Sequence, residues 1–212
     1  MTVYTVQSID DLKCEPFAKC IIGSYTSRGR ALDECVGYIM ERIKTRMDLA
    51  RSMTHDYYHP EVYKFFVESP NDGVTVVRRG CVRKLREFLR DELGEHSCYY
   101  VWDGESNWFF DIDENDVVGE LWHTVTWGDS DCEDPQFTTP WPETFTSQES
   151  AIESFIDYVK DFYRSRFMKG SDRFLREARK ALKKDGKVQV DLNDGCSVSC
   201  VLYRDDANNV KE

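Results

Sequence analysis

The sequence contains YTSRGRALDECVGYIMERIKTR at residues 25–46 and FTSQESAIESFIDYVKDFYRSR at residues 145–166. These two stretches align with each other without a gap. Each begins with a Thr-Ser pair, whose hydroxyl groups can cap the free N–H groups of a helix. Thr146 and Glu149 also have the spacing of a capping box. Apolar residues then recur three and four positions apart, which is the spacing of one buried helix face. Both stretches are therefore predicted to be amphipathic helices with the same kind of packing face.

The likeness between the two parts extends on both sides of these helices. A short strand precedes each one, at Tyr4–Val6 and at His123–Val125. A second amphipathic helix that contains Leu-Arg-Glu follows each one, over about residues 81–93 and 172–184. Gly94 and Gly186 stand where these second helices are expected to end, because glycine readily takes the left-handed conformation that closes a helix.

Each second helix is followed by two runs typical of strands, separated by an Asp-Gly pair. The first pair of runs is Cys98–Trp102 and Asn107–Ile112, with Asp103-Gly104 between them. The second pair is Lys187–Leu192 and Ser197–Tyr203, with Asp194-Gly195 between them. Asp-Gly between alternating apolar residues predicts a β-hairpin.

We therefore predict an α+β fold of two tandem pseudo-repeat units, packed as one compact body. Each unit consists of a strand, an amphipathic helix, a second helix and a β-hairpin. The first unit covers residues 1–117 and holds an insertion at about residues 47–80, and the second covers residues 118–212. Each unit alone is near the lower size for an independent core, so we expect the two to pack together.

The charge of the chain is concentrated in one window. The net charge is −11, yet the stretch from Tyr100 to Asp161 holds sixteen acidic residues and one lysine, so the rest of the chain is slightly basic. All five tryptophans lie in the same window. Phosphate binding needs Lys and Arg, so nucleic acid is not expected as a partner. A basic protein partner suits this charge.

The sequence carries no signal for export or membrane insertion. The N-terminal residues lack a basic segment followed by an apolar run, and no apolar stretch approaches the ~20 residues of a membrane helix. The eight cysteines include no Cys-x-x-Cys pair, so neither a zinc ribbon nor a redox motif is indicated. We expect an intracellular protein, cytoplasmic or nuclear, with reduced cysteines and no membrane contact.

No local motif selects a catalytic or metal site. His55 and His59 have the i, i+4 spacing of a metal pair and would need a third ligand, such as Asp56 or a remote cysteine. They can equally be histidines that pack against aromatic residues. The acidic runs that begin at Asp111 and Asp129 lack the glycine and glutamate of a calcium loop. The chain contains no nucleophile elbow, P-loop or dinucleotide fingerprint. We assign no catalytic residue, metal or cofactor.

These observations favour a non-enzymatic protein that binds a protein partner through its acidic, tryptophan-rich window, as a viral or phage inhibitor or a mimic of nucleic acid would. The alternatives are a carbohydrate-active hydrolase with paired carboxylates in a Trp-lined cleft, and a structural component of a larger assembly. The residues predicted to contact the partner are Trp102, Trp108, Asp111, Asp113, Asp116, Trp122, Trp127, Asp129 and Asp131.

Overall fold

The structure is a computed structural model that describes residues 1–10, 21–69, 73–117, 120–128, 141–166, 171–191 and 197–205. It contains both helices and antiparallel sheets, which confirms the α+β class. The contacts divide the chain into two compact units at Glu114 and Asn115. The N-terminal unit holds residues 4–10 and 21–114, and the C-terminal unit holds Met1–Val3 and the described residues from Asn115 onward.

The N-terminal unit is built on a four-stranded sheet in the order β2-β1-β6-β5. These strands are β1 (Thr2–Asp10), β2 (Ile21–Tyr25), β5 (Cys98–Trp102) and β6 (Asn107–Asp116). The predicted hairpin is the antiparallel pair β5–β6, and Gly104 in its turn has a φ of +96°. The strand β2 pairs antiparallel with β1 and has no counterpart among the predicted elements.

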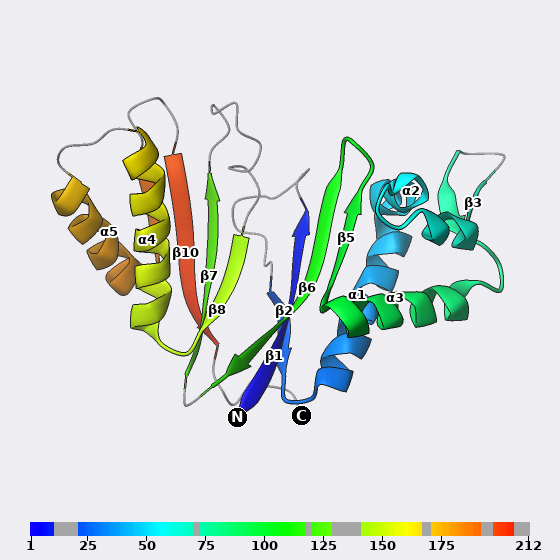
Figure 1. Cartoon of the computed structure of the whole chain (residues 1–212), viewed down its shortest axis with the longest axis horizontal. Helices are drawn as coiled ribbons and strands as arrows, with labels where there is room; N and C mark the ends of the chain where they lie inside the picture. Colours follow the sequence, from blue (N-terminus) through cyan, green and yellow to red (C-terminus); the bar gives the residue numbers. More distant parts are fainter. Residues whose placement is uncertain are drawn as a thin grey trace. The chain divides into compact units, whose positions relative to one another are not determined.

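Helices cover one face of this sheet (Figure 1). The long helix α1 (Arg28–Thr45) begins at Ser27, whose Oγ accepts a hydrogen bond from the backbone N–H of Arg30 at 3.4 Å. The helix α3 (Val82–His96) packs beside α1 and buries Leu85, Leu89 and Leu93. The predicted apolar face of α1 is buried, with these residues in the core: Ala31, Leu32, Cys35, Val36, Ile39 and Ile43.

The insertion of the N-terminal unit begins with two short helices. It contains α2 (Met47–His55) and the 3₁₀ helix η1 (Pro60–Phe65). A short antiparallel hairpin follows, made of β3 (Phe66–Glu68) and β4 (Thr75–Val77). Pro60 stands at the start of η1, where proline favours a helical turn over a paired strand.

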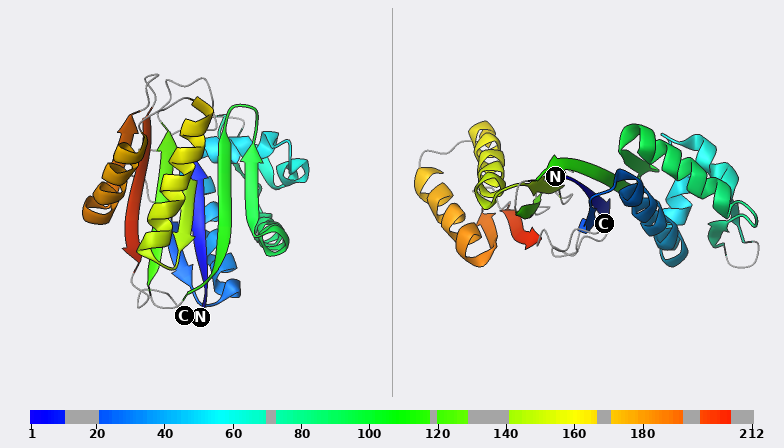
Figure 2. Two further views of the ribbon diagram at one scale, coloured as in Figure 1. Left: turned by 60° about the vertical axis from the view of Figure 1, so that its left-hand side comes forward. Right: turned by 90° about the horizontal axis from the view of Figure 1, so that it is seen from below.

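The C-terminal unit has its own four-stranded sheet in the order β8-β7-β10-β9. The strands are β7 (Leu121–Gly128), β8 (Trp141–Phe145), β9 (Lys187–Asp191) and β10 (Ser197–Asp205). The helices α4 (Gln148–Arg166) and α5 (Ser171–Asp185) lie on one face of this sheet (Figures 1 and 2). Ser147 caps α4 as Ser27 caps α1, because its Oγ accepts a hydrogen bond from the N–H of Ser150 at 3.1 Å.

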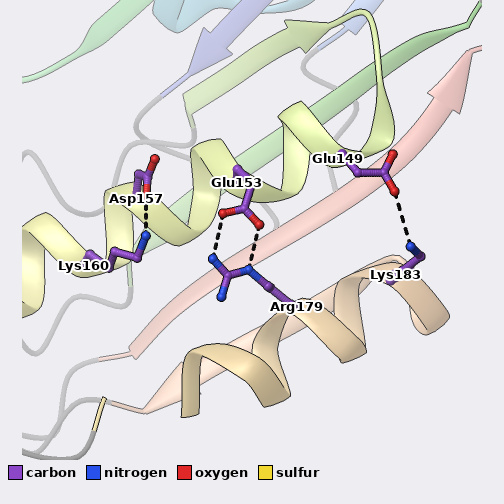
Figure 3. Close-up of polar contacts among 6 residues, drawn as sticks. All are labelled: Glu149, Glu153, Asp157, Lys160, Arg179 and Lys183. Carbon is purple, nitrogen blue, oxygen red and sulfur yellow. Dashed lines mark hydrogen bonds and ion pairs between the residues drawn. The ribbon is translucent and has the colours of Figure 1, made fainter. Parts of the chain in front are cut away.

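Ion pairs join the exposed sides of α4 and α5 (Figure 3). Arg179 donates two hydrogen bonds of 2.7 Å to the carboxylate of Glu153. The ammonium of Lys183 lies 3.3 Å from the carboxylate of Glu149. Below these polar contacts, the two helices share a core with β9 and β10 that includes Phe155, Leu182 and Val198.

The strand order is β2-β1-β6-β5 in the N-terminal unit and β8-β7-β10-β9 in the C-terminal unit. The two orders are the same if β7 corresponds to β1, β8 to β2, β9 to β5 and β10 to β6. In both, a long helix follows the second strand and another helix precedes the hairpin. The pseudo-repeat, and with it the duplication of one unit into two, stays a prediction. The Asp194-Gly195 turn lies outside the described residues.

The ends of the two second helices differ from each other. Gly186 follows α5 with a φ of +65°, as predicted. Gly94 lies inside α3, and the left-handed residue at the end of that helix is Ser97, with a φ of 59°. The prediction that Gly94 ends α3 is therefore wrong by one helical turn. Serine at this position carries a steric cost that glycine would not.

None of the described helices is long and apolar enough to cross a membrane. The four cysteines within the described residues, Cys35, Cys81, Cys98 and Cys200, are free thiols. Burial raises the pKa of both Cys35 and Cys200 to about 12. These two side chains therefore act as small apolar groups in their cores.

Candidate functional site

One tryptophan of the predicted interaction surface is a core residue. Trp108 is only 1% exposed, and the guanidinium of Arg46 lies 5.0 Å from the centre of its ring. Side chains alternate along β6, so Trp108, Phe110 and Ile112 enter the core together. Trp108 is therefore not available as an exposed contact, which corrects its predicted role.

The opposite face of β6 carries the acidic residues. Asp111 and Asp113 are half-buried there. Burial, with a further contribution from the charge of Asp113, raises the pKa of Asp111 to about 6. Cys98 lies opposite Asp111 in the β5–β6 pairing. Asp111 thus becomes charged only near neutral pH, unlike an ordinary surface carboxylate.

Two further predicted contact residues with described side chains, Asp116 and Trp122, belong to the C-terminal unit. Asp116 is exposed and accepts a hydrogen bond of 2.9 Å from the hydroxyl of Thr2. Trp122 packs partly against the core under α4 and donates a hydrogen bond of 3.1 Å to Glu120. The backbone of Trp127 belongs to β7, but its side chain lies outside the described part of the structure, as do Asp129 and Asp131.

A group of aromatic side chains lies in the N-terminal unit, and we call it the aromatic surface: the exposed Tyr57, Tyr58 and Trp102 and the half-buried Tyr100. Tyr57 is 69% exposed, Tyr58 is 60% exposed and Trp102 is 38% exposed. The ring centre of Trp102 lies 5.5 Å from that of Tyr57 and 6.2 Å from that of Tyr58. Tyr58 also meets Tyr100 edge to face, with ring centres 5.3 Å apart.

Backbone hydrogen bonds hold the segment that carries the two tyrosines. The N–H of Tyr57 donates to the carbonyl oxygen of Trp102 at 3.2 Å. The N–H of Tyr58 donates to Oδ1 of Asp56 at 2.9 Å. These bonds fix the Asp56–His59 segment against the end of β5. The aromatic surface is therefore organised by the backbone and does not depend on ring contacts alone.

Acidic residues border the aromatic surface at the β5–β6 turn. Asp103 accepts hydrogen bonds from the N–H groups of Glu105 and Ser106, at 3.0 and 2.7 Å. Glu105 is exposed. A Cβ atom added to Gly104 would lie 3.7 Å from the ring of Tyr57, so the turn and the tyrosine are in close proximity. The surface thus combines aromatic rings with negative charge.

A second group of side chains includes His59, the last residue of the same segment. His59, Glu61 and Glu92 each offer one ligand atom, and these atoms lie within 4.8 Å of one another. Nδ1 of His59 is 3.6 Å from Oε2 of Glu92. The imidazole stacks on the ring of Tyr99, with centres 4.5 Å apart and planes inclined by 24°. His55, the other histidine of the predicted pair, is exposed and does not belong to this group.

Two buried oxygen atoms accompany this group. Oδ2 of Asp56 and the hydroxyl of Tyr99 have no hydrogen-bond partner among the described residues, although Asp56 is 4% exposed and Tyr99 is 1% exposed. Burial raises the pKa of both groups, and the charges of Asp56, Glu92 and Glu61 raise that of Tyr99 further. A buried polar group without a partner costs about 1–3 kcal/mol.

Neither the aromatic surface nor the group of His59, Glu61 and Glu92 can be predicted from a local sequence motif. Trp102 is far from Tyr57 and Tyr58 along the chain, and the β5–β6 hairpin brings them together. Glu92 belongs to α3 and reaches His59 only because α3 packs on η1.

The sequence contains one signal for the burial of Trp108. Ile112 between Asp111 and Asp113 identifies the inward positions of β6, and counting back by twos places Trp108 in the core.

Comparison with known proteins adds no further assignment. No protein-family model, no curated protein and no solved structure matches this chain.

Proposed function

We propose that the chain is a non-enzymatic binding protein, whose aromatic surface anchors a basic protein partner. The observation that carries this proposal is the contact of Trp102 with both Tyr57 and Tyr58 while all three remain exposed. Tyr and Trp dominate the energetic centres of protein interfaces because they bury a large rigid area on binding. Three such side chains in one place form a compact anchor.

The charge around these rings supports a basic partner. Asp103 and Glu105 border the surface, and the whole chain has a net charge of −11. A Lys or Arg side chain of the partner would gain a cation–π contact with an exposed ring and Coulomb attraction to these carboxylates. Long-range attraction would also speed the encounter of the two proteins.

The backbone supports binding without a large ordering cost. Tyr57 and Tyr58 are tied through hydrogen bonds to Trp102 and Asp56. A contact surface that is already ordered loses less conformational entropy on association than a flexible loop does. A narrower form of this proposal is that the partner normally binds nucleic acid. An acidic protein can compete with nucleic acid for the basic groove of such a partner.

The test is a binding experiment with the full chain and matched aromatic variants. The immobilised chain is exposed to lysate of the cells that produce it, and retained proteins are eluted with rising salt and identified by mass spectrometry. A retained partner is then purified, and its Kd is measured for wild type, Tyr57→Ala, Trp102→Ala and Tyr63→Ala. Tyr63 is the control, because it is 62% exposed and is not part of the aromatic surface.

We expect Tyr57→Ala and Trp102→Ala each to weaken binding by at least about tenfold, as truncation of an interface anchor does. Tyr63→Ala should bind as wild type does, and moderate salt should weaken all of the complexes. The proposal is rejected if the retained partner binds Trp102→Ala and wild type equally. Competition by duplex DNA for the purified partner distinguishes the narrower case from a partner that does not bind nucleic acid.

A further inference from the structure

We propose that His59, Glu61 and Glu92 form a binding site for a divalent transition-metal ion, with Zn²⁺ as the best fit. This inference goes beyond the proposed protein contact and does not rest on it. It starts from the only such group of potential ligands found among the described residues.

The distances between the donor atoms suit a shared ion better than a direct bond. Nδ1 of His59 and Oε2 of Glu92 are 3.6 Å apart, which is longer than the ~3.2 Å limit of a good hydrogen bond. Zn²⁺ binds nitrogen and oxygen at roughly 2.0–2.2 Å in tetrahedral geometry, which separates two donors by about 3.4 Å. The His59–Glu92 separation is therefore close to an edge of this tetrahedron. Glu61 offers a third donor atom within 4.8 Å of the other two.

The ligands are presented by ordered elements. His59 directly precedes η1, and Glu61 lies in the first turn of that helix, after Pro60. Glu92 lies on α3, whose apolar side is buried through Leu85, Leu89 and Leu93. The stacking of His59 on Tyr99 holds the plane of the imidazole. A metal site needs this kind of support, because small displacements of the ligands weaken coordination.

A second observation indicates a ligand at this position. The hydroxyl of Tyr99 and Oδ2 of Asp56 are both more than nine-tenths buried, and neither has a hydrogen-bond partner among the described residues. Tyr99 lies against His59, with ring centres 4.5 Å apart. Around metal sites, such groups hydrogen-bond the ligands or a metal-bound water. The unpartnered hydroxyl therefore belongs to the residue whose ring stacks on the proposed histidine ligand.

The charge and the chemical type of the donors identify the class of ion. A neutral imidazole and two carboxylates carry a charge of −2, which a divalent cation balances. Ca²⁺ and Mg²⁺ prefer oxygen ligands alone, whereas Zn²⁺ accepts one histidine with carboxylates. Three protein ligands leave a fourth position for water or for a side chain of a partner. The competing interpretation is a His59–Glu92 ion pair that needs no metal.

Binding to the full chain can be measured directly. The protein is purified in the presence of a chelator, its cysteines are blocked with N-ethylmaleimide, and Zn²⁺ is titrated by calorimetry. The same titration is made with Co²⁺, whose visible absorption reports tetrahedral coordination. Variants of two ligands, Glu61→Gln and Glu92→Gln, are compared with two controls, Glu95→Gln and His55→Ala. Glu95 is exposed on the same helix as Glu92, and His55 is exposed at the end of α2.

We expect one Zn²⁺ per chain, and a loss of affinity of at least about tenfold in each ligand variant, since a lost ligand should cost no less than the 10–100-fold found for outer-shell partners. The controls should bind as wild type does, and Mg²⁺ should bind far more weakly. Because Glu61 is exposed, Glu61→Gln should fold normally and keeps the test valid if Glu92→Gln does not. The proposal is overturned if wild type takes up no Zn²⁺, or if Glu61→Gln binds it as tightly as wild type.

Discussion

Glu153 of α4 accepts two hydrogen bonds of 2.7 Å from the guanidinium of Arg179 on α5. Asp33, which aligns with Glu153 in the predicted pseudo-repeat, makes an ion pair with Arg90 of α3. Both units therefore join their two helices by a carboxylate at the same position of the longer helix and an arginine on the other helix. The bidentate geometry favours Arg over Lys at this contact.

A double-mutant cycle should detect coupling between Glu153 and Arg179. We expect Glu153→Gln and Arg179→Gln to show an interaction energy of about 0.5–1 kcal/mol in urea denaturation, which is the upper range for exposed pairs. The pair Glu149–Lys183 is longer and more exposed, so its cycle should give less and serves as the control. Equal energies in both cycles would contradict the importance of the bidentate geometry.

The same pair should contribute to acid sensitivity. The hydrogen bonds from Arg179 hold the pKa of Glu153 below its usual value. A carboxylate with a lowered folded-state pKa contributes stability above its unfolded pKa, and this stability is lost as the pH falls through the folded value. Wild type should therefore lose more stability than Glu153→Gln between about pH 5 and pH 3. The comparison is made by thermal unfolding at a series of pH values.

Asp111 should show the opposite pH dependence. Its pKa is raised to about 6, first by burial and then by the charge of Asp113. A raised folded-state pKa means that the charged form is disfavoured in the folded protein. The contribution of Asp111 to stability is therefore favourable below its unfolded-state pKa, and it is lost as the pH rises through about 6. Asp111→Asn should therefore match wild type near pH 4 and be more stable at about pH 7.5, by about 1 kcal/mol after allowance for partial exposure.

A second variant separates the two causes of this shift. Asp113→Asn removes the neighbouring charge and leaves the burial of Asp111 unchanged. We expect it to lower the pKa of Asp111 only in part, because burial is the larger cause. Proton titration of Asp111 by NMR measures this directly. An Asp111 that titrates near the usual aspartate value in wild type would contradict both expectations.

The tryptophans of the acidic window should separate into structural and surface residues. Trp108→Ala should cost about 3–5 kcal/mol of the free energy of unfolding, as removal of a large core side chain does. Trp102→Ala should cost less than about 1 kcal/mol, because Trp102 is 38% exposed. If Trp108→Ala fails to fold, Trp108→Phe provides a milder comparison. Similar costs for Trp102→Ala and Trp108→Ala would contradict their different burial.

The sequence was most informative where a local pattern determines the structure. The apolar positions of α1 and the Thr-Ser pairs at the starts of α1 and α4 can be predicted because helix periodicity and capping are local. The predicted capping box had Thr146 as its cap, whereas Ser147 accepts the capping hydrogen bond of α4. The strands β2 and β8 were missed, and both lie at a sheet edge. An edge strand pairs on one side only, so it tolerates Gly23 in β2 and Pro142 in β8, and such residues weaken the strand pattern.

The candidate sites depend on contacts between distant parts of the chain. Tyr57 meets Trp102 through the register of the β5–β6 hairpin, and His59 meets Glu92 through the packing of α3 on η1. A single sequence contains no local signal for either contact. The histidine spacing drew attention to His59, but it suggested His55 as its companion, whereas the structure places Glu61 and Glu92 there.

Two glycine substitutions should have opposite effects on stability. Gly94 lies within α3, and nothing lies within 4 Å of a Cβ atom added to it. Gly94→Ala should therefore stabilise the protein by about 0.5–1 kcal/mol, through the higher helix propensity of alanine. Gly186 has a φ of +65°, and a Cβ atom added there would lie 2.9 Å from the carbonyl oxygen of Leu202. Gly186→Ala should cost at least about 1–2 kcal/mol, because backbone strain and steric clash act together.

The third member of this comparison is Ser97, which ends α3 in the left-handed conformation. Ser97→Gly should stabilise the protein by up to about 1 kcal/mol, because glycine adopts this conformation without the steric cost. Chemical denaturation of the three variants measures all of these changes. A stabilising Gly186→Ala, or a destabilising Gly94→Ala, would contradict the assignment of Gly186 to a helix end and Gly94 to a helix interior. If Gly94→Ala and Ser97→Gly are both stabilising, they support an end of α3 at Ser97, one turn beyond the position that the sequence suggested.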